Sequence, residues 1–217
     1  MSTALINEFI LAIGQTLYMV FASGIIASIF GLPLGVVLFT TRQKNILANT
    51  FFNTVLATMT NIVRSIPFII LLVAIIPFTR FIAGTSIGTT AAIVPLSISA
   101  IPFIGRLVET SLTEVAGGLI EAGIAMGATP IQIIKKILIP EALPGIIRGI
   151  TITLIALIGY SAMAGAIGGG GLGDLAIRYG YQRFNVEIMI ATIIVLIIIV
   201  QLVQWAGDYF SRKFTHN

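Results

Sequence analysis

Five long apolar stretches fill most of the sequence, and they constrain the fold more than any other feature. They cover roughly residues 9–40, 51–78, 87–108, 143–167 and 186–206. Each is long enough to cross a bilayer, since a helix needs about 20 residues for one crossing. Inside lipid the backbone N–H and C=O groups must be bonded within the protein, which helices achieve. The sequence therefore predicts an all-α integral membrane protein with five transmembrane helices.

The composition excludes several other classes of protein. Hydrophobic residues make up 57% of the chain and charged residues 9%, which excludes an ordinary soluble domain. The absence of cysteine excludes disulfides and thiolate metal sites. The net charge is +4, but the cations do not form one basic patch interleaved with aromatic residues. No nucleic-acid partner is therefore expected.

Glycine and proline interrupt several of these stretches. The first is longer than one crossing needs and contains four residues that disfavour a straight helix: Gly24, Gly31, Pro33 and Gly35. We expect it to tilt, kink or break. The second is interpreted as one span with Pro67 inside it, and Pro144 suits the first turn of the fourth. Residues 168–183, between the last two spans, are rich in glycine and are expected to form a flexible loop.

The distribution of cations predicts the orientation in the membrane. One set of loops and span ends holds Arg42, Lys44, Arg106, Lys135, Lys136, Arg148, Arg212 and Lys213, and the opposite set holds Arg80, Arg178 and Arg183. Loops with the excess of Lys and Arg lie on the cytoplasmic side. The N-terminus is then outside and the C-terminus cytoplasmic. An odd number of spans does not divide into two equal inverted repeats, so a homodimer is the simplest way to enclose a polar route.

A segment of small and polar residues between the third and fourth stretches is interpreted as two short helices joined at a corner. Residues 117–126 favour a helix, and Gly127 can adopt the left-handed conformation that ends it. Thr129, Pro130 and Gln132 fit a capping box that starts a second helix, which Pro140 is expected to stop. The first helix has one nearly smooth face, suited to lying in a partner's groove. An ordinary surface hairpin between spans is the alternative.

The spacing of this segment resembles a motif of the membrane subunits of ABC importers, Glu-Ala-Ala, three residues, Gly, nine residues, Ile-x-Leu-Pro. Glu121, Ala122, Gly127, Ile137 and Pro140 match it, while Gly123 and Ile139 replace an Ala and a Leu. In that family the segment docks onto a separate ATPase subunit. The resemblance therefore implies a cytoplasmic coupling segment over about residues 112–138, with ten coupling residues: Glu121, Ala122, Gly123, Ala125, Gly127, Ala128, Thr129, Pro130, Ile137 and Pro140.

No motif in the sequence indicates that this chain binds a nucleotide, hydrolyses ATP or binds a metal. Residues 168–173 fit G-x-G-x-x-G formally, but they follow a membrane helix rather than a strand. No G-x-x-x-x-G-K-[ST] motif occurs, so the chain is not expected to hydrolyse ATP, and no catalytic residue is proposed. No spacing of His and carboxylates resembles a metal site, and His216 lies in the C-terminal tail.

A polar group, Asn61, Arg64 and Ser65, lies inside the second stretch just before Pro67. A cation within a span normally faces protein, water or a counter-ion. We interpret Arg64 as a brace that holds helices together through carbonyls or an acidic residue such as Glu109. Contact with a substrate is the alternative.

The fourth stretch is least bulky over residues 159–165, where Tyr160 and Met163 are the only large side chains. Small residues allow helices to approach closely, and such packing is one interpretation. The other is a narrow pathway at a dimer axis, with Tyr160, Ser161 and Met163 as pathway or gate residues.

Four segments, residues 61–68, 126–130, 140–144 and 159–163, resemble the permease subunits of bacterial methionine ABC importers. The resemblance implies a type I importer fold, a single transmembrane domain over residues 1–217 with its core at about 14–205, and a place in the bacterial inner membrane. It also implies a homodimer, two cytoplasmic ATPase subunits that bind ATP and Mg, an extracytoplasmic methionine-binding protein, and L- and D-methionine as substrates. This chain would bind no cofactor. Importers of another amino acid or small peptide, ion-driven transporters and non-transporting scaffolds remain alternatives.

Overall fold

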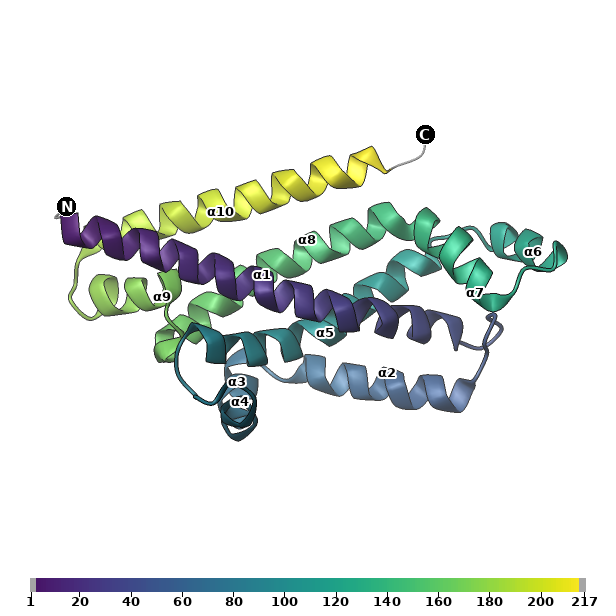
Figure 1. The fold of residues 1–217 in the computed structure, drawn as a ribbon, viewed down its shortest axis with the longest axis horizontal. Helices are drawn as coiled ribbons and strands as arrows, with labels where there is room; N and C mark the ends of the chain where they lie inside the picture. Colours follow the sequence, from purple (N-terminus) through teal and green to yellow (C-terminus); the bar gives the residue numbers. More distant parts are fainter. Residues whose placement is uncertain (1–2, 215–217) are drawn as a thin grey trace.

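The computed structural model describes residues 3–214, and every regular element in that range is helical. The helices run lengthwise in an elongated bundle, with the N-terminus and α9 at one end and α6, α7 and the C-terminus at the other (Figure 1). In chain order the elements are α1 (Thr3–Thr40), α2 (Thr50–Ser65), α3 (Phe68–Ala74), α4 (Ile76–Ala83), α5 (Thr89–Thr113), α6 (Gly117–Ala125), α7 (Pro130–Ile133), the π-helical turn η1 (Ile134–Leu138), α8 (Ile139–Ala164), η2 (Gly165–Gly169), α9 (Gly171–Leu175), η3 (Ala176–Tyr181) and α10 (Val186–Lys213).

The centre of the bundle is α5, which α1 and α8 flank. Leu96, Ile104 and Leu112 of α5 are almost completely buried, in the same apolar core as Met19 of α1 and Leu157 of α8. In the described range four helical runs are long and apolar enough to cross a membrane, and α2 with α3 makes a fifth if the pair counts as one span.

The second predicted span, residues 51–78, is made of separate helices and not of one continuous helix. It breaks at Ile66 and Pro67, and the axes of α2 and α3 meet at 99°. Ile66 has an extended backbone with φ −82° and ψ 122°. The cause is local, because proline pushes the residue before it out of the α region.

Of the tilt, kink or break expected for the first span, a break is not present. The helix α1 is continuous from Thr3 to Thr40. Its glycines serve close packing instead. A Cβ atom at Gly31 would lie 2.8 Å from the Cβ of Ile104, and one at Gly35 would lie 2.5 Å from the Gly105 carbonyl oxygen. The backbone of α1 can therefore approach α5 only with glycine at these positions.

Pro140 does not stop the helix that follows the corner, so that prediction is also wrong. The chain stays helical from Pro130 to Ala164, so the helix that contains the fourth span starts well before residue 143. The N–H of Ile139 donates to the carbonyl of Ile134, five residues back, in the π-helical turn η1. Pro140 then sits at the start of α8, where its missing N–H breaks no bond within that helix.

The glycine-rich segment is a packed helical corner rather than the flexible loop expected from the sequence. The backbone N–H of Gly171 donates to Oε1 of Gln15 at 2.8 Å, and that of Leu172 to Oγ1 of Thr16 at 2.9 Å. A Cβ atom at Gly173 would overlap the backbone of Ala162. The glycines therefore let this corner pack against α1 and α8, and flexibility is not their role.

We expect Gly35→Ala to lower the thermal midpoint of the purified protein, because the new methyl group meets the backbone of α5. Overpacking of this kind costs about 1–3 kcal/mol. Gly14→Ala on the same helix is the matched control, since a Cβ atom there meets nothing within 4 Å. The control should be neutral or slightly stabilising, because alanine favours a helix over glycine. Equal midpoints for the two variants would contradict the packing role of Gly35.

Candidate coupling segment and pathway surface

The corner between α6 and α7 has the geometry that the sequence predicted. Gly127 has φ +76°, the left-handed conformation, and the Ala128 N–H donates to the Gly123 carbonyl oxygen at 3.0 Å. The capping box is also confirmed. The Thr129 N–H donates to Oε1 of Gln132 at 2.8 Å, and the Gln132 N–H donates to Oγ1 of Thr129 at 3.4 Å. Local hydrogen bonds therefore satisfy backbone groups at the end of α6 and at the start of α7.

Gly123 departs from the importer motif, and the structure gives the reason. It is buried, and a Cβ atom there would lie 2.8 Å from Cδ1 of Ile137 and 3.5 Å from Cγ1 of Ile133. These isoleucines belong to the second helix of the hairpin, so α6 packs directly on it. The glycine makes room for Ile137, another residue of the motif.

This hairpin lies at the end of the bundle (Figure 1), and part of its surface is apolar. Four large apolar side chains are exposed there: Leu119, Ile124, Met126 and Ile131. Ala122 and Ala125 are exposed between them. An exposed apolar patch of this kind is typical of a surface that binds a partner.

The second helix of the hairpin is joined to α8 without a flexible linker. The turn η1 connects α7 directly to α8 within one helical run. On its first side only residues 114–116 separate α5 from α6. A movement of the hairpin therefore displaces α8, because a continuous helix transmits displacement along its axis.

Glu109 of α5 is bonded to the loop after α1 near this end of the bundle, and its partner Arg106 extends the network to α2. This arrangement was not predicted from the sequence. The Glu109 side chain is buried between two arginines, with Oε1 2.7 Å from Nη2 of Arg42 and Oε2 2.6 Å from Nη1 of Arg106. Arg106 also donates to Oδ1 of Asn61 at 2.9 Å and to the Ala57 carbonyl oxygen at 3.1 Å. The network links the loop after α1 to α2 and α5. Its sequence signal was Arg106 and Glu109 at helical i, i+3 spacing.

Arg64 is therefore not the partner of Glu109, and that prediction is corrected. Among the described residues, Arg64 makes no hydrogen bond or ion pair. It is exposed, and its guanidinium carbon lies 5.8 Å from the centroid of the Phe103 ring. Ser65 is exposed and donates to the Asn61 carbonyl oxygen within α2. One turn of helix separates Asn61 from Arg64, so only Asn61 meets the network.

Arg64 and Tyr160 line the same small cavity of about 140 Å³, together with the hydroxyl-bearing residues Ser99 and Thr153. The Tyr160 ring stacks on Phe68 with 4.7 Å between centroids and 8° between planes. The structure thus brings the polar group of α2 next to the least bulky section of α8, which the sequence treated as separate sites.

Of the other two predicted gate residues, only Met163 lies on an exposed face of the subunit, which we call its open side. It is 46% exposed, on a face of α8 that also presents Ile152 and Gly159. Ser161 is buried, and its hydroxyl donates to the Ile158 carbonyl oxygen at 2.7 Å. Ser161 is therefore not on the open face of this subunit, because it points into the core from the opposite side of α8.

Comparison with known proteins identifies the family. The profile of the binding-protein-dependent transport system inner membrane components matches residues 31–216. This chain belongs to that family. The chain is thus a permease subunit in the inner membrane, with the all-helical fold of type I ABC importers.

Two relatives from bacteria show how far the similarity extends. The chain is 55% identical to a protein of Vibrio cholerae named probable D-methionine transport system permease protein, over 94% of this chain and 90% of that one. It is 54% identical to the D-methionine transport system permease protein of Escherichia coli K12, over 76% of each chain.

Solved structures agree in fold. A chain of the MetNI methionine ABC transporter, described as inward facing, aligns over the full length of both chains with TM-score 0.98 and 51% identity. A chain of an amino acid ABC transporter solved with histidines aligns over 97% of this chain and 95% of that one, with TM-score 0.79 and 19% identity. This second similarity shows the fold alone.

We expect Glu109→Gln to lower the folded yield and the thermal midpoint strongly, because it leaves two arginines without their carboxylate. Breaking a buried ion pair from one side costs about 3–5 kcal/mol. Glu114→Gln, an exposed change one turn and a half further along the chain, should have little effect. If both variants give the same folded yield in size-exclusion chromatography and the same midpoint in thermal-shift measurements, Glu109 does not hold the loop after α1, α2 and α5 together.

Proposed function

We propose that this chain is the membrane-spanning permease subunit of an ATP-driven importer of methionine. The observation that carries the proposal is the full-length match to a chain of a methionine ABC transporter at 51% identity and TM-score 0.98. Relatives at 50–56% identity are named as D-methionine permeases, which supports D-methionine as one substrate beside the L-methionine that we also propose. An importer of another amino acid shares this fold and is the second candidate.

Charge and geometry together support the orientation that we propose. The coupling hairpin, the end of α1 and the end of α10 lie at the same end of the bundle (Figure 1). This end holds Arg42, Lys44, Lys135, Lys136, Arg212 and Lys213. An excess of cations supports a cytoplasmic position for this end. The N-terminus then lies outside, where an extracytoplasmic binding protein delivers the substrate.

ATP hydrolysis belongs to a partner in this proposal. The chain lacks a phosphate-binding G-x-x-x-x-G-K-[ST] loop, so ATP and Mg would be bound by two cytoplasmic ATPase subunits. The exposed apolar patch of α6 and α7 would dock into a groove on each of them. No cofactor is assigned to this chain.

A second copy of this chain would cover the open side of α2. Thr60 is the only buried residue of that helix within the described structure. Asn61, Arg64 and Ser65 are exposed there, within a span, and polar groups at such a depth face protein or water rather than lipid. Two copies that place these residues and Met163 around a common axis would enclose a polar route.

The mechanism that fits this arrangement is alternating access. Closure of the ATPase pair on ATP moves the two hairpins, and each moves α8 through the continuous run from α7. The exposed face of α8, with Met163, then separates from its twin and the route opens outward. Hydrolysis returns the subunits to the state open to the cytoplasm. A thioether gate suits a thioether substrate, since sulfur is polarisable and methionine side chains repack easily.

The test is uptake by proteoliposomes that contain this chain, the ATPase and the binding protein. We expect ATP-dependent accumulation of radiolabelled methionine and no accumulation without ATP. Uptake driven by an ion gradient alone would identify a secondary transporter. Preference for another amino acid would support the second candidate.

We expect Gly127→Asp to weaken both ATPase binding and transport. A non-glycine residue in the left-handed conformation costs about 1–2 kcal/mol, which corresponds to roughly tenfold in an equilibrium. Asp also adds a charge to the docking surface. Gly127→Asn is the matched control, because Asn and Asp adopt this conformation about equally and differ in charge, so the control isolates the effect of the added charge. Normal pull-down of the ATPase and normal uptake by the Asp variant, at normal expression, would rule out the docking assignment.

We expect Arg64→Met to lower methionine uptake while folded yield stays near that of the unchanged protein. Arg64 has no hydrogen bond or ion pair to lose within the described residues, and a cation on the open face can meet the carboxylate of an amino acid. Yield from size-exclusion chromatography and uptake in vesicles separate the two effects. A large loss of yield with normal uptake per folded protein would restore the role of Arg64 as a brace.

We expect Met163→Cys to cross-link to its twin in the resting complex and less readily with ATP bound. Met163 is 46% exposed on the open face of α8. Ser161→Cys, buried two residues away, is the matched control and should not cross-link in either state. If the thiol introduced at position 163 never couples but reacts with a lipid-soluble probe, this position faces lipid and the gate assignment is wrong.

A further inference from the structure

Arg64 carries a positive charge that has no ion-pair partner among the described residues. It is the next-to-last residue of α2, which runs from the hairpin end towards the middle of the bundle (Figure 1). At 1.5 Å per residue Arg64 is about 20 Å along the helix axis from Thr50. Its guanidinium contacts only the Phe103 ring, 5.8 Å from the centroid. A cation at such a depth normally has a partner, and the identity of that partner bears on function.

Most carboxylates of this chain lie at the two ends of the bundle. All eight Asp and Glu residues are in the described range. One group belongs to the elements at the end that holds the N-terminus: Glu8 of α1, Asp174 of α9 and Glu187 of α10 (Figure 1). A second group belongs to the elements around the coupling hairpin: Glu114 after α5, Glu121 of α6 and Glu141 of α8. Neither group lies at the level of Arg64.

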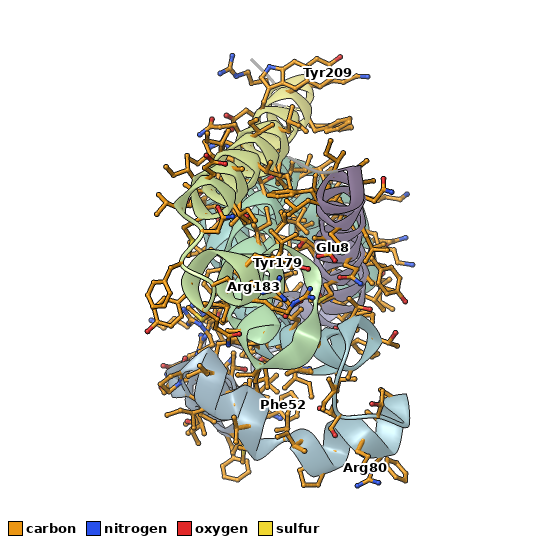
Figure 2. All side chains as sticks on the ribbon, turned by 90° about the vertical axis from the view of Figure 1, so that its left-hand side faces the viewer. Glu8, Phe52, Arg80, Tyr179, Arg183 and Tyr209 are labelled. Carbon is orange, nitrogen blue, oxygen red and sulfur yellow. The ribbon has the colours of Figure 1, made fainter. Side chains whose placement is uncertain are left out.

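The two remaining carboxylates do not reach Arg64 either. Glu109 is buried, and its two oxygens are already bonded to two arginines. Asp208 belongs to the last part of α10. Its neighbour Tyr209 lies on the opposite side of the molecule from Phe52 of α2 (Figure 2). The subunit itself therefore supplies no counter-charge to Arg64.

A second copy of the chain does not supply one in the proposed dimer. A two-fold axis along the length of the bundle keeps each residue of the second copy at the level it has in the first. The carboxylates of the second copy then also lie at the ends, and its own Arg64 adds another positive charge in the middle. Lipid is excluded from this position, because the second copy covers α2. The negative charge must therefore come from a molecule that enters the route.

The cavity that Arg64 lines has the groups to hold one end of an amino acid. Its volume is about 140 Å³, and no Asp or Glu is in its lining. Two hydroxyl groups line it, and each already donates to a carbonyl of its own helix: Ser99 to Leu96 at 2.9 Å and Thr153 to Gly149 at 2.8 Å. These hydroxyl oxygens are therefore left as acceptors only.

The two charged groups of an amino acid would be bound unequally here. A carboxylate accepts charge-assisted hydrogen bonds from a guanidinium, which are about twice as strong as bonds between neutral groups. An ammonium would meet a neutral acceptor such as the half-buried Ser99 hydroxyl oxygen. One strong contact at the α-carbon does not distinguish the L from the D form. The cavity is therefore suited to select a carboxylate and to accept both stereoisomers.

The size of the cavity indicates where the side chain of such a ligand lies. Pockets that enclose a whole ligand have about 300–1,000 Å³, so this one encloses only the carboxylate end. Tyr160 is in its lining, and Met163 is three residues further on α8. Residues at this spacing are neighbours on a helix surface. A side chain that leaves the cavity along α8 therefore reaches Met163, which is 46% exposed.

We propose that the cavity at Arg64 is a substrate subsite of the route. The Arg64 guanidinium binds the α-carboxylate of an amino acid, and an unbranched apolar side chain extends along α8 to Met163. The subsite rests on the proposed function, since it assigns a place within the permease to the imported amino acid.

The experiment is photo-crosslinking of the nucleotide-free complex of this chain with its ATPase, without the binding protein. The probe is photo-methionine, a methionine analogue that has a diazirine in place of the thioether and keeps both charged groups. We expect it to label peptides of this chain that contain residues 63–68, 99–103 or 153–163, as mapped by mass spectrometry. Labelling spread evenly over all spans would overturn the proposal.

Two competitors that each lack one charged group of methionine test the selection of the carboxylate. 4-(Methylthio)butanoic acid keeps the carboxylate, and 3-(methylthio)propylamine keeps the ammonium. We expect the acid to compete with the probe about as well as methionine does, and the amine to compete at least about tenfold more weakly. Equal competition by the two compounds would overturn the proposal. This measurement uses the unchanged protein and does not depend on the folding of any variant.

Variants test the residue itself. We expect Arg64→Gln to lower labelling per folded protein about tenfold, and Arg64→Lys, which keeps the charge, to retain a larger part of it. Arg80→Gln is the matched control, because Arg80 is also an exposed cation but does not line the cavity. It should leave labelling unchanged. Size-exclusion chromatography gives the folded amount of each variant.

The uptake assay separates failure of the subsite from failure of the proposed function. ATP-dependent methionine uptake by the unchanged complex, together with labelling that Arg64→Gln does not reduce, would overturn the subsite and leave the proposed function intact. Absence of methionine uptake with ATP would overturn the proposed function and the subsite with it.

Discussion

The hydrogen-bonding needs of the backbone inside lipid set the shape of this molecule. A buried N–H or C=O group without a partner is costly in a bilayer, so each interruption of a helix needs a local remedy. The remedy at Pro140 is the π-helical turn before it, which keeps the run from α7 to α8 helical. The remedy at the glycine-rich corner comes from α1, where Gln15 and Thr16 accept the N–H groups of Gly171 and Leu172. The break at Pro67 falls instead on the open side of the subunit.

The subunit has a tightly packed part, formed by α1, α5 and α8, and a more loosely held helix, α2. α1, α5 and α8 share the buried core, and close glycine contacts fix α1 against α5. α2 has a single buried residue, Thr60, and the bonds from Arg106 to Asn61 and Ala57 tie it to α5. Glu109 thus holds Arg106 in the position from which it bonds α2, a helix that has little buried surface of its own. A helix attached mainly through one polar junction can change its angle without disturbing the core.

The parts of this structure that depend on local sequence could be predicted, and the parts that depend on contacts between distant segments could not. Gly127 and Thr129 form a turn and a cap from their own neighbours, so their geometry followed from the sequence. The spans followed from hydrophobicity. The role of the glycines in residues 168–173 required α1 and α8 as neighbours, and the pairing of Glu109 with Arg42 required the loop after α1 to lie against α5. The same holds for Ser161, since its burial depends on which face of α8 meets the core.

The unbroken helix from Pro130 to Ala164 can be considered as a lever. At 1.5 Å per residue it is about 50 Å long, so a rotation of about 5° at the docking end displaces the far end by about 4 Å. Such a displacement is comparable to the width of a methionine side chain. A flexible joint at Pro140 would have absorbed that rotation within the hairpin. The π-helical turn avoids this loss, and a small movement at the membrane surface is thereby enlarged where the two subunits would meet.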